Sequence, residues 1–142
     1  MRIRFWLLLP LCAATPASAQ SCAVTVSPVI FGNYSPFSDA PLDTTSQVVV
    51  NCAGIAGYEV ALNAGMNGGS FKNRHLLNGK SRLSYQFYSD GARTRIWGDG
   101  TGGSTIVSAS ASASLAIYAR VPARQNVATG IYTDTVLVTI SY

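Results

Sequence analysis

Histidine, cysteine and charged residues are all scarce in this sequence, and each shortage narrows the range of functions. The chain has one histidine and three cysteines, and charged residues make up 11% of it. A protein metal site needs several histidine, cysteine or carboxylate ligands at workable spacing, and His75 has no such companions nearby. We therefore expect His75 to lie in a surface loop, and we expect neither a metal ion nor a cofactor.

The sequence has no apolar run long enough to anchor it permanently in a membrane. Its one candidate, residues 5–14, follows two arginines and precedes the small residues Ala-Ser-Ala at 17–19. A positively charged start, a short apolar stretch and a small-residue cleavage site are typical of a secretory signal peptide. We predict a signal peptide over residues 1–19 and an exported domain over residues 20–142, with no membrane span after cleavage.

Positive charge is too thinly spread for a nucleic-acid-binding protein. The net charge of +4 falls to about +2 when Arg2 and Arg4 leave with the signal peptide. A surface that follows phosphates needs a concentrated basic patch with stacking aromatic residues, so we expect no nucleic-acid partner and a solvated position for the basic side chains. These are Lys72, Arg74, Lys80, Arg82, Arg93, Arg95, Arg120 and Arg124.

Two cysteines remain after signal cleavage, Cys22 and Cys52. An exported compartment is oxidising, so we predict that these two residues form a disulfide that ties the first strand to the next. The chain-entropy treatment of a loop of this length puts the contribution of the bridge at roughly 3 to 4 kcal/mol.

Apolar residues recur at every second position in several short segments, which is the period of a half-buried strand. Stretches rich in glycine, asparagine and serine, at 65–70, 76–81 and 98–103, separate these segments and favour turns. No window has a helical stripe, so the pattern predicts an antiparallel, immunoglobulin-like sandwich. The repeat SASASAS at 108–114 fits either a flat strand or an extended loop. The alternating apolar residues are Val48 and Val50; Tyr58, Val60 and Leu62; Leu83, Tyr85 and Phe87; and Leu115, Ile117 and Val121.

Candidate catalytic motifs have simpler structural interpretations. Residues 98–103 match GxGxxG, but the residues after them lack the helical period that a dinucleotide site requires, so we expect a turn. No GxSxG elbow surrounds a serine. Asp90 and Asp99 are expected turn residues, although a secreted hydrolase that uses them is a third, weaker hypothesis. Trp97 is more consistent with the core than with a sugar-stacking platform, and we expect no enzyme.

Three motifs occur in a specific order along the chain. They are LxYxxYxD at 83–90, WGDG at 97–100 and GxYTDT at 130–135, and they follow Cys22 and Cys52. In this arrangement the sequence resembles the spore coat protein U domain family across essentially all of residues 20–142.

The resemblance implies an all-β, incomplete immunoglobulin-like sandwich that lacks one strand, similar to pilin subunits of the archaic chaperone-usher pathway. In that pathway a periplasmic chaperone first supplies the missing strand. An outer-membrane usher receives the subunit, and another pilin-like subunit then donates its N-terminal strand in place of the chaperone. The protein would pass through the periplasm to the cell surface.

The segment TVLVTISY at 135–142 is the candidate acceptor of that strand. Its inward side consists of Val136, Val138, Ile140 and Tyr142, which we predict to form the strand-acceptor and chaperone-binding surface. The alternative is that these residues belong to an ordinary core strand of a complete sandwich.

The predicted mature chain has almost no N-terminal segment that could serve as a donated strand, because only Gln20 and Ser21 precede Cys22. We therefore expect it to accept a strand and to be poorly equipped to donate one. The leading hypothesis is a non-enzymatic structural subunit of a secreted surface assembly. The alternative is an adhesive tip or ligand-binding module whose loops hold Trp97, His75 and Arg74.

Overall fold

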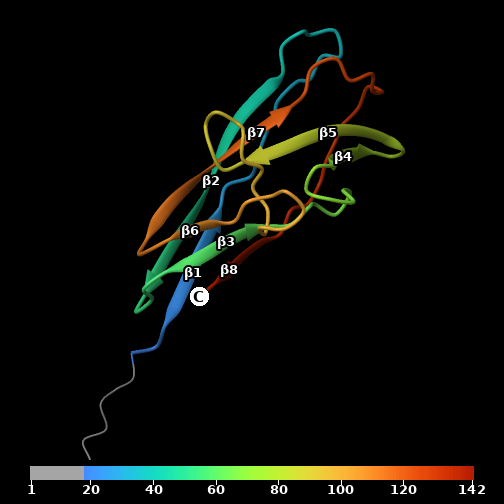
Figure 1. Cartoon of the computed structure of the whole chain (residues 1–142). Coiled ribbons are helices and arrows are strands. Elements are labelled where there is room, and N and C mark those ends of the chain that lie inside the picture. The colour runs from blue at the N-terminus through green and yellow to red at the C-terminus, as the bar shows by residue number, and fades with distance from the viewer. Residues whose placement is uncertain (1–17) are drawn as a thin grey trace, which may run out of the picture.

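The structure, a computed structural model, describes residues 18–142 as strands connected by turns and loops (Figure 1). Nearly all of the predicted signal peptide lies outside the described residues. Within the described part of the chain, no helix is long and apolar enough to cross a membrane. The strands are β1 (Ser21–Val26), β2 (Leu42–Ala53), β3 (Tyr58–Leu62), β4 (Arg74–Asn78), β5 (Ser81–Tyr88), β6 (Val107–Ala109), β7 (Ala113–Val121) and β8 (Val138–Ser141).

The strands form two antiparallel sheets. The five-stranded sheet has the order β1-β2-β7-β5-β4, and the three-stranded sheet has the order β6-β3-β8. Both sheets contribute side chains to one core. This confirms the predicted all-β, immunoglobulin-like class, and the position of β1 and β8 at sheet edges fits an incomplete sandwich.

The alternating residues found in the sequence account for most of the core. The repeat SASASAS is divided between β6 and β7, which belong to different sheets, and Ala111 in the turn between them has a positive φ of 58°. This repeat therefore lies where the chain crosses from one sheet to the other. The buried residues from the predicted strands are Val48, Val50, Tyr58, Val60, Leu62, Leu83, Tyr85, Phe87, Ile117 and Val121.

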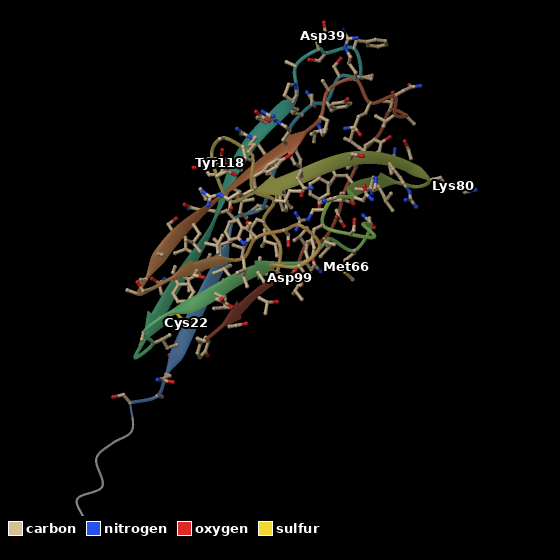
Figure 2. The ribbon with its side chains drawn as sticks, in the orientation of Figure 1. Cys22, Asp39, Met66, Lys80, Asp99 and Tyr118 are labelled. Carbon is tan, nitrogen blue, oxygen red and sulfur yellow. A yellow bond between two sulfur atoms is a disulfide. The ribbon has the colours of Figure 1, made fainter. Side chains whose placement is uncertain are left out.

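The β4–β5 hairpin corrects two expectations. Arg74, expected on the solvated surface, is 0% exposed, and His75, expected in a loop, is a half-buried residue of β4. Lys80 marks the tip of the hairpin in Figure 2. Polar residues occupy both ends of β4, so it lacks the long apolar alternation of the other strands and was missed in the sequence.

Candidate strand-acceptor groove

The strand β8 has a free edge. It pairs with β3 on one side, and no other strand of residues 18–142 pairs with its second side. The N–H of Asn63 donates to the carbonyl of Leu137 at 3.0 Å. The N–H of the preceding residue, Leu62, points away from β8 and donates to the carbonyl of Gly98 at 3.2 Å. Opposite residues of two antiparallel strands alternate between hydrogen-bonded and non-hydrogen-bonded pairs, and in a non-hydrogen-bonded pair the N–H and C=O groups point away from the partner strand. The N–H and C=O groups of Val138 and Ile140 therefore point to the free edge.

The strand β1 has a matching free edge on the other sheet. Cys22 and Cys52 are directly opposite, with Cα atoms 4.1 Å apart, which is the spacing of a non-hydrogen-bonded pair. Ser27, five residues after Cys22, forms a hydrogen-bonded pair with Gln47, because its N–H donates to the carbonyl of Gln47 at 3.0 Å. The same alternation leaves the backbone groups of Val24 and Val26 directed away from β2. These two residues are 40% and 42% exposed.

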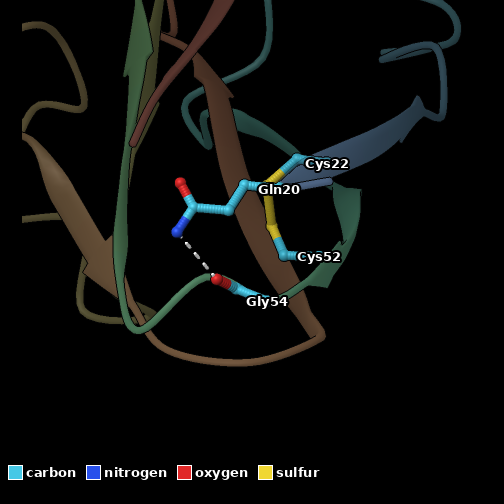
Figure 3. Close-up of a disulfide and its surroundings, with 4 residues drawn as sticks. All are labelled: Gln20, Cys22, Cys52 and Gly54. Carbon is cyan, nitrogen blue, oxygen red and sulfur yellow. Dashed lines mark hydrogen bonds between the residues drawn. A yellow bond between two sulfur atoms is a disulfide. The ribbon is translucent and has the colours of Figure 1, made fainter. Parts of the chain in front are cut away.

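The predicted disulfide between Cys22 and Cys52 is confirmed, and it fastens this edge to the sheet (Figure 3). Gln20 adds a second attachment, because its side-chain amide donates to the carbonyl of Gly54 at 3.1 Å. Both attachments join the start of β1 to β2 and the loop that follows it, and the opposite edge of β1 has no neighbouring strand among the described residues.

The two free edges border an apolar groove. Residues 26–29, Phe31, 134–136 and Val138 line a cavity of about 310 Å³, and residues 29–34, Pro36 and 127–134 line a second cavity of about 720 Å³. The two walls run in opposite directions, as the blue and dark red segments of Figure 1 show. Core side chains from both sheets form the floor of the smaller cavity: Leu62, Leu76, Tyr85, Phe87 and Ile117.

A carboxylate fixes the wall that leads into β8. Asp134 Oδ1 accepts hydrogen bonds from the amides of Met66, Asn67 and Thr135 at 3.0, 3.2 and 2.8 Å. Its Oδ2 accepts a 2.6 Å bond from the hydroxyl of Tyr85. Burial, followed by the bond to Asp134, raises the pKa of Tyr85 above its usual value, so the phenol stays protonated. Asp134 thus links the wall to both a loop and the core.

Arg74 supports the same wall from beneath. Its guanidinium donates to the carbonyl of Asn63 at 2.6 Å, to Gln86 Oε1 at 2.7 Å and to the carbonyl of Trp97 at 2.8 Å. It also lies over the ring of Phe87, 5.4 Å from the ring centroid. Burial lowers its pKa to about 10, which leaves it charged at neutral pH. Asn63 in turn accepts a hydrogen bond from Leu137 at 2.9 Å.

The structure places three of the four proposed acceptor residues on this wall. Val136, Val138 and Ile140 are half-buried and pack against the core, and the first two line the smaller cavity. Tyr142 is 65% exposed, and neither Ile140 nor Tyr142 lines either cavity. That these residues receive a strand stays a prediction. Sequence reasoning missed the opposite wall, although Val24 and Val26 alternate in β1 as the acceptor residues do in β8.

The other candidate sites are turns or core positions. Trp97 is 1% exposed and its indole N–H donates to Val60 at 2.9 Å, so it has no face available for a sugar. Asp90 accepts from the amide of Arg95 at 2.8 Å, and Asp99 accepts from the amide of Thr101 at 2.8 Å. Hydrogen bonds from neighbouring threonines lower the pKa of both carboxyl groups. No group of metal-ligating side chains suitable for an ion occurs within residues 18–142.

Comparison with known families identifies the chain. A family model described as Spore Coat Protein U domain matches residues 9–139. The chain belongs to the spore coat protein U domain family. This confirms the resemblance seen in the sequence motifs. Among curated protein sequences, none matches the chain.

Solved pilus proteins share the fold of this spore coat protein U domain. One is a chain of the CsuC–CsuE chaperone-tip adhesion subunit pre-assembly complex, from archaic chaperone-usher Csu pili of Acinetobacter baumannii, with a TM-score of 0.61 and 19% identity. That match covers 87% of this chain and 40% of the other. The P pilus rod subunit PapA has a TM-score of 0.54 and 18% identity, with 85% and 98% covered. At these identities the likeness concerns the fold.

Proposed function

We propose that this protein is a non-enzymatic structural subunit of a secreted surface assembly, and that a strand from another polypeptide closes the groove between β1 and β8. The observation that carries the proposal is the pair of unpaired edges, with an apolar cavity lined by core side chains between their two walls. Such an edge is a template for pairing with another chain and leads to aggregation unless it is covered.

An inserted strand would satisfy both edges at once. Its backbone could bond to Val138 and Ile140 on one side and to Val24 and Val26 on the other, while alternate apolar side chains cover the floor. Because the two walls run in opposite directions, the strand would be parallel to one of them and antiparallel to the other.

The partners we propose follow from the family. A periplasmic chaperone would cover the groove first, an outer-membrane usher would receive the subunit, and a pilin-like subunit would then replace the chaperone strand. The signal peptide proposed for residues 1–19 would direct the protein to the periplasm and from there to the cell surface. The CsuC–CsuE complex, in which a chaperone is bound to a tip adhesion subunit and one chain shares this fold over 40% of its length, supports the first of these steps.

Amide hydrogen exchange tests the proposal at single residues. The exported protein is produced alone and together with the periplasmic chaperone of its host's chaperone-usher system, and the two samples are compared. We expect a soluble one-to-one complex in which the amides of Val138 and Ile140 become protected. The amide of Thr139, which faces β3, should be protected in the complex and in the free chain. Slow exchange at Val138 and Ile140 in a stable, partner-free monomer would overturn the proposal.

A pair of adjacent substitutions tests the side-chain surface. Val138→Ser shortens an inward residue of the groove, whereas Leu137→Ser shortens a neighbour that is 62% exposed on the outside. Both variants are first compared by circular dichroism for intact β structure. Chaperone capture should weaken in Val138→Ser and persist in Leu137→Ser, and equal capture by both would count against the groove.

The adhesive alternative loses two of the three residues that motivated it, and the third, His75, lies half-buried in β4 and not in a loop. Arg74 and Trp97 are buried and their polar groups are hydrogen-bonded inside the protein, so neither can contact a ligand at the surface. No other observation favours that function over the structural one.

A further inference from the structure

Two Asn-Gly dipeptides occur in the sequence, Asn67-Gly68 and Asn78-Gly79, and the fold brings both against the same wall of the groove. Asn67 Nδ2 donates to the carbonyl of Thr133 at 2.9 Å, and Asn78 Nδ2 donates to the carbonyl of Thr129 at 3.4 Å. These side chains come from a loop and from a hairpin that are separate in the sequence. Both tether the segment 129–133, which lines the larger cavity.

Asn-Gly is the dipeptide most prone to spontaneous deamidation, because glycine has no side chain to hinder the reaction. The backbone nitrogen of glycine attacks Cγ of asparagine, ammonia leaves, and a succinimide forms. Water then opens the ring to aspartate or isoaspartate. The net change exchanges an amide nitrogen for an oxygen and needs only water.

The fold treats the two dipeptides differently. Gly79 is exposed at the tip of the β4–β5 hairpin, has a positive φ of 57° and has open space where a Cβ would lie. Gly68 is wedged between the carbonyls of Ala64 and Asn73, which a Cβ would meet at 2.5 and 2.7 Å. The backbone amide of Asn67 is also held by Asp134 at 3.2 Å. The attack requires the backbone to rearrange, and only the hairpin tip has room for it.

We propose that Asn78-Gly79 is a deamidation site in the folded protein, that the fold protects Asn67-Gly68, and that conversion of Asn78 loosens the groove wall. The product carboxylate cannot donate to the carbonyl of Thr129, and it places negative charge against that oxygen. The side-chain amide of Asn78 also packs directly on Gly130. Isoaspartate would further lengthen the backbone at the last residue of β4, directly before the two-residue turn that leads into β5.

Peptide mapping by mass spectrometry, with isoaspartate resolved by chromatography, tests the chemical part. The full exported protein is incubated at mildly alkaline pH, folded and separately in urea with reductant. In the folded protein, conversion at Asn78 should exceed that at Asn67 several-fold, whereas in urea the two should convert at comparable rates. Equal conversion in the folded protein, or an unreactive Asn78 there, would overturn the proposal.

The effect on the wall is tested with Asn78→Asp, and Asn51→Asp supplies the same charge change at an exposed site on β2. Amide exchange in residues 129–133 should accelerate several-fold in Asn78→Asp and stay unchanged in Asn51→Asp. Equal exchange in both variants would refute the loosening. Weaker strand capture by Asn78→Asp would extend the effect to the groove, a step that rests on the proposed function. If the unmodified protein captures no strand, the proposed function fails, while the mapping and exchange results still decide this inference.

Discussion

The hydroxyl of Tyr85 donates a 2.6 Å hydrogen bond to Oδ2 of Asp134 and so joins the centre of the core to the wall of the groove. Tyr85 is 3% exposed and belongs to the five-stranded sheet, whereas Asp134 lies on the segment that leads into β8 of the other sheet. Three backbone amides complete the partners of the carboxylate. The position of the wall therefore depends on a contact between the two sheets.

Removing this hydroxyl should destabilise the protein measurably. Tyr85→Phe deletes one charge-assisted hydrogen bond while Asp134 keeps its amide donors, so we expect a loss of about 1 to 2 kcal/mol in the free energy of unfolding. Urea denaturation measures it. Tyr88→Phe is the control, because that hydroxyl makes no hydrogen bond within the described residues. Equal losses in the two variants would show that the bond contributes nothing specific.

The same phenol should make stability fall at alkaline pH. Burial raises the pKa of Tyr85 in the folded protein above its ordinary value of 10.0. The unfolded chain therefore loses this proton first, and the stabilisation present below pH 10 decreases as the pH rises above it. Wild-type protein should lose unfolding free energy more steeply than Tyr85→Phe above pH 10. Parallel pH profiles for the two proteins would contradict this assignment.

Gly65 is required where the loop approaches the carboxylate. It has a positive φ of 84°, and a Cβ at this position would collide with Asp134 Oδ2. We expect Gly65→Ala to cost more than about 1 kcal/mol and to lower the melting temperature. Gly69→Ala in the same loop is the matched control, because a Cβ there meets no atom within 4 Å. Similar melting temperatures for the two variants would argue against the collision.

Replacing Arg74 should be among the most damaging single changes. Arg74→Met leaves the carbonyls of Asn63 and Trp97 and the side chain of Gln86 without their donor inside the protein. Each buried acceptor left without its hydrogen bond costs about 1 to 3 kcal/mol, so we expect the three losses together to lower the free energy of unfolding by more than about 3 kcal/mol. Arg82→Met, at an exposed position on β5, should be nearly neutral in urea denaturation. A mild effect of Arg74→Met would mean that water replaces the lost donors.

Local patterns were sufficient to predict most of the strands. Tyr58, Val60 and Leu62 alternate with polar or small residues and are all buried, as are Leu83, Tyr85 and Phe87. A strand with one face on the core must alternate in this way, so the signal is present in each short segment by itself.

Arg74 and the wall formed by β1 could not be predicted in the same way. An arginine is almost always solvated, and its burial here depends on acceptors from three other segments that meet only in the folded protein. Val24 and Val26 carry the alternation of any strand. Their role at an open edge depends on which strands become their neighbours.

The sequence by itself determined most of the strand-forming segments and the pairing of Cys22 with Cys52, because these follow from local alternation and from the two cysteines left after the predicted signal. Only the tertiary structure decided that β1 and β8 face each other with unpaired edges and that Asp134 meets Tyr85. Those relationships join residues distant in the chain, and packing of the two sheets sets them.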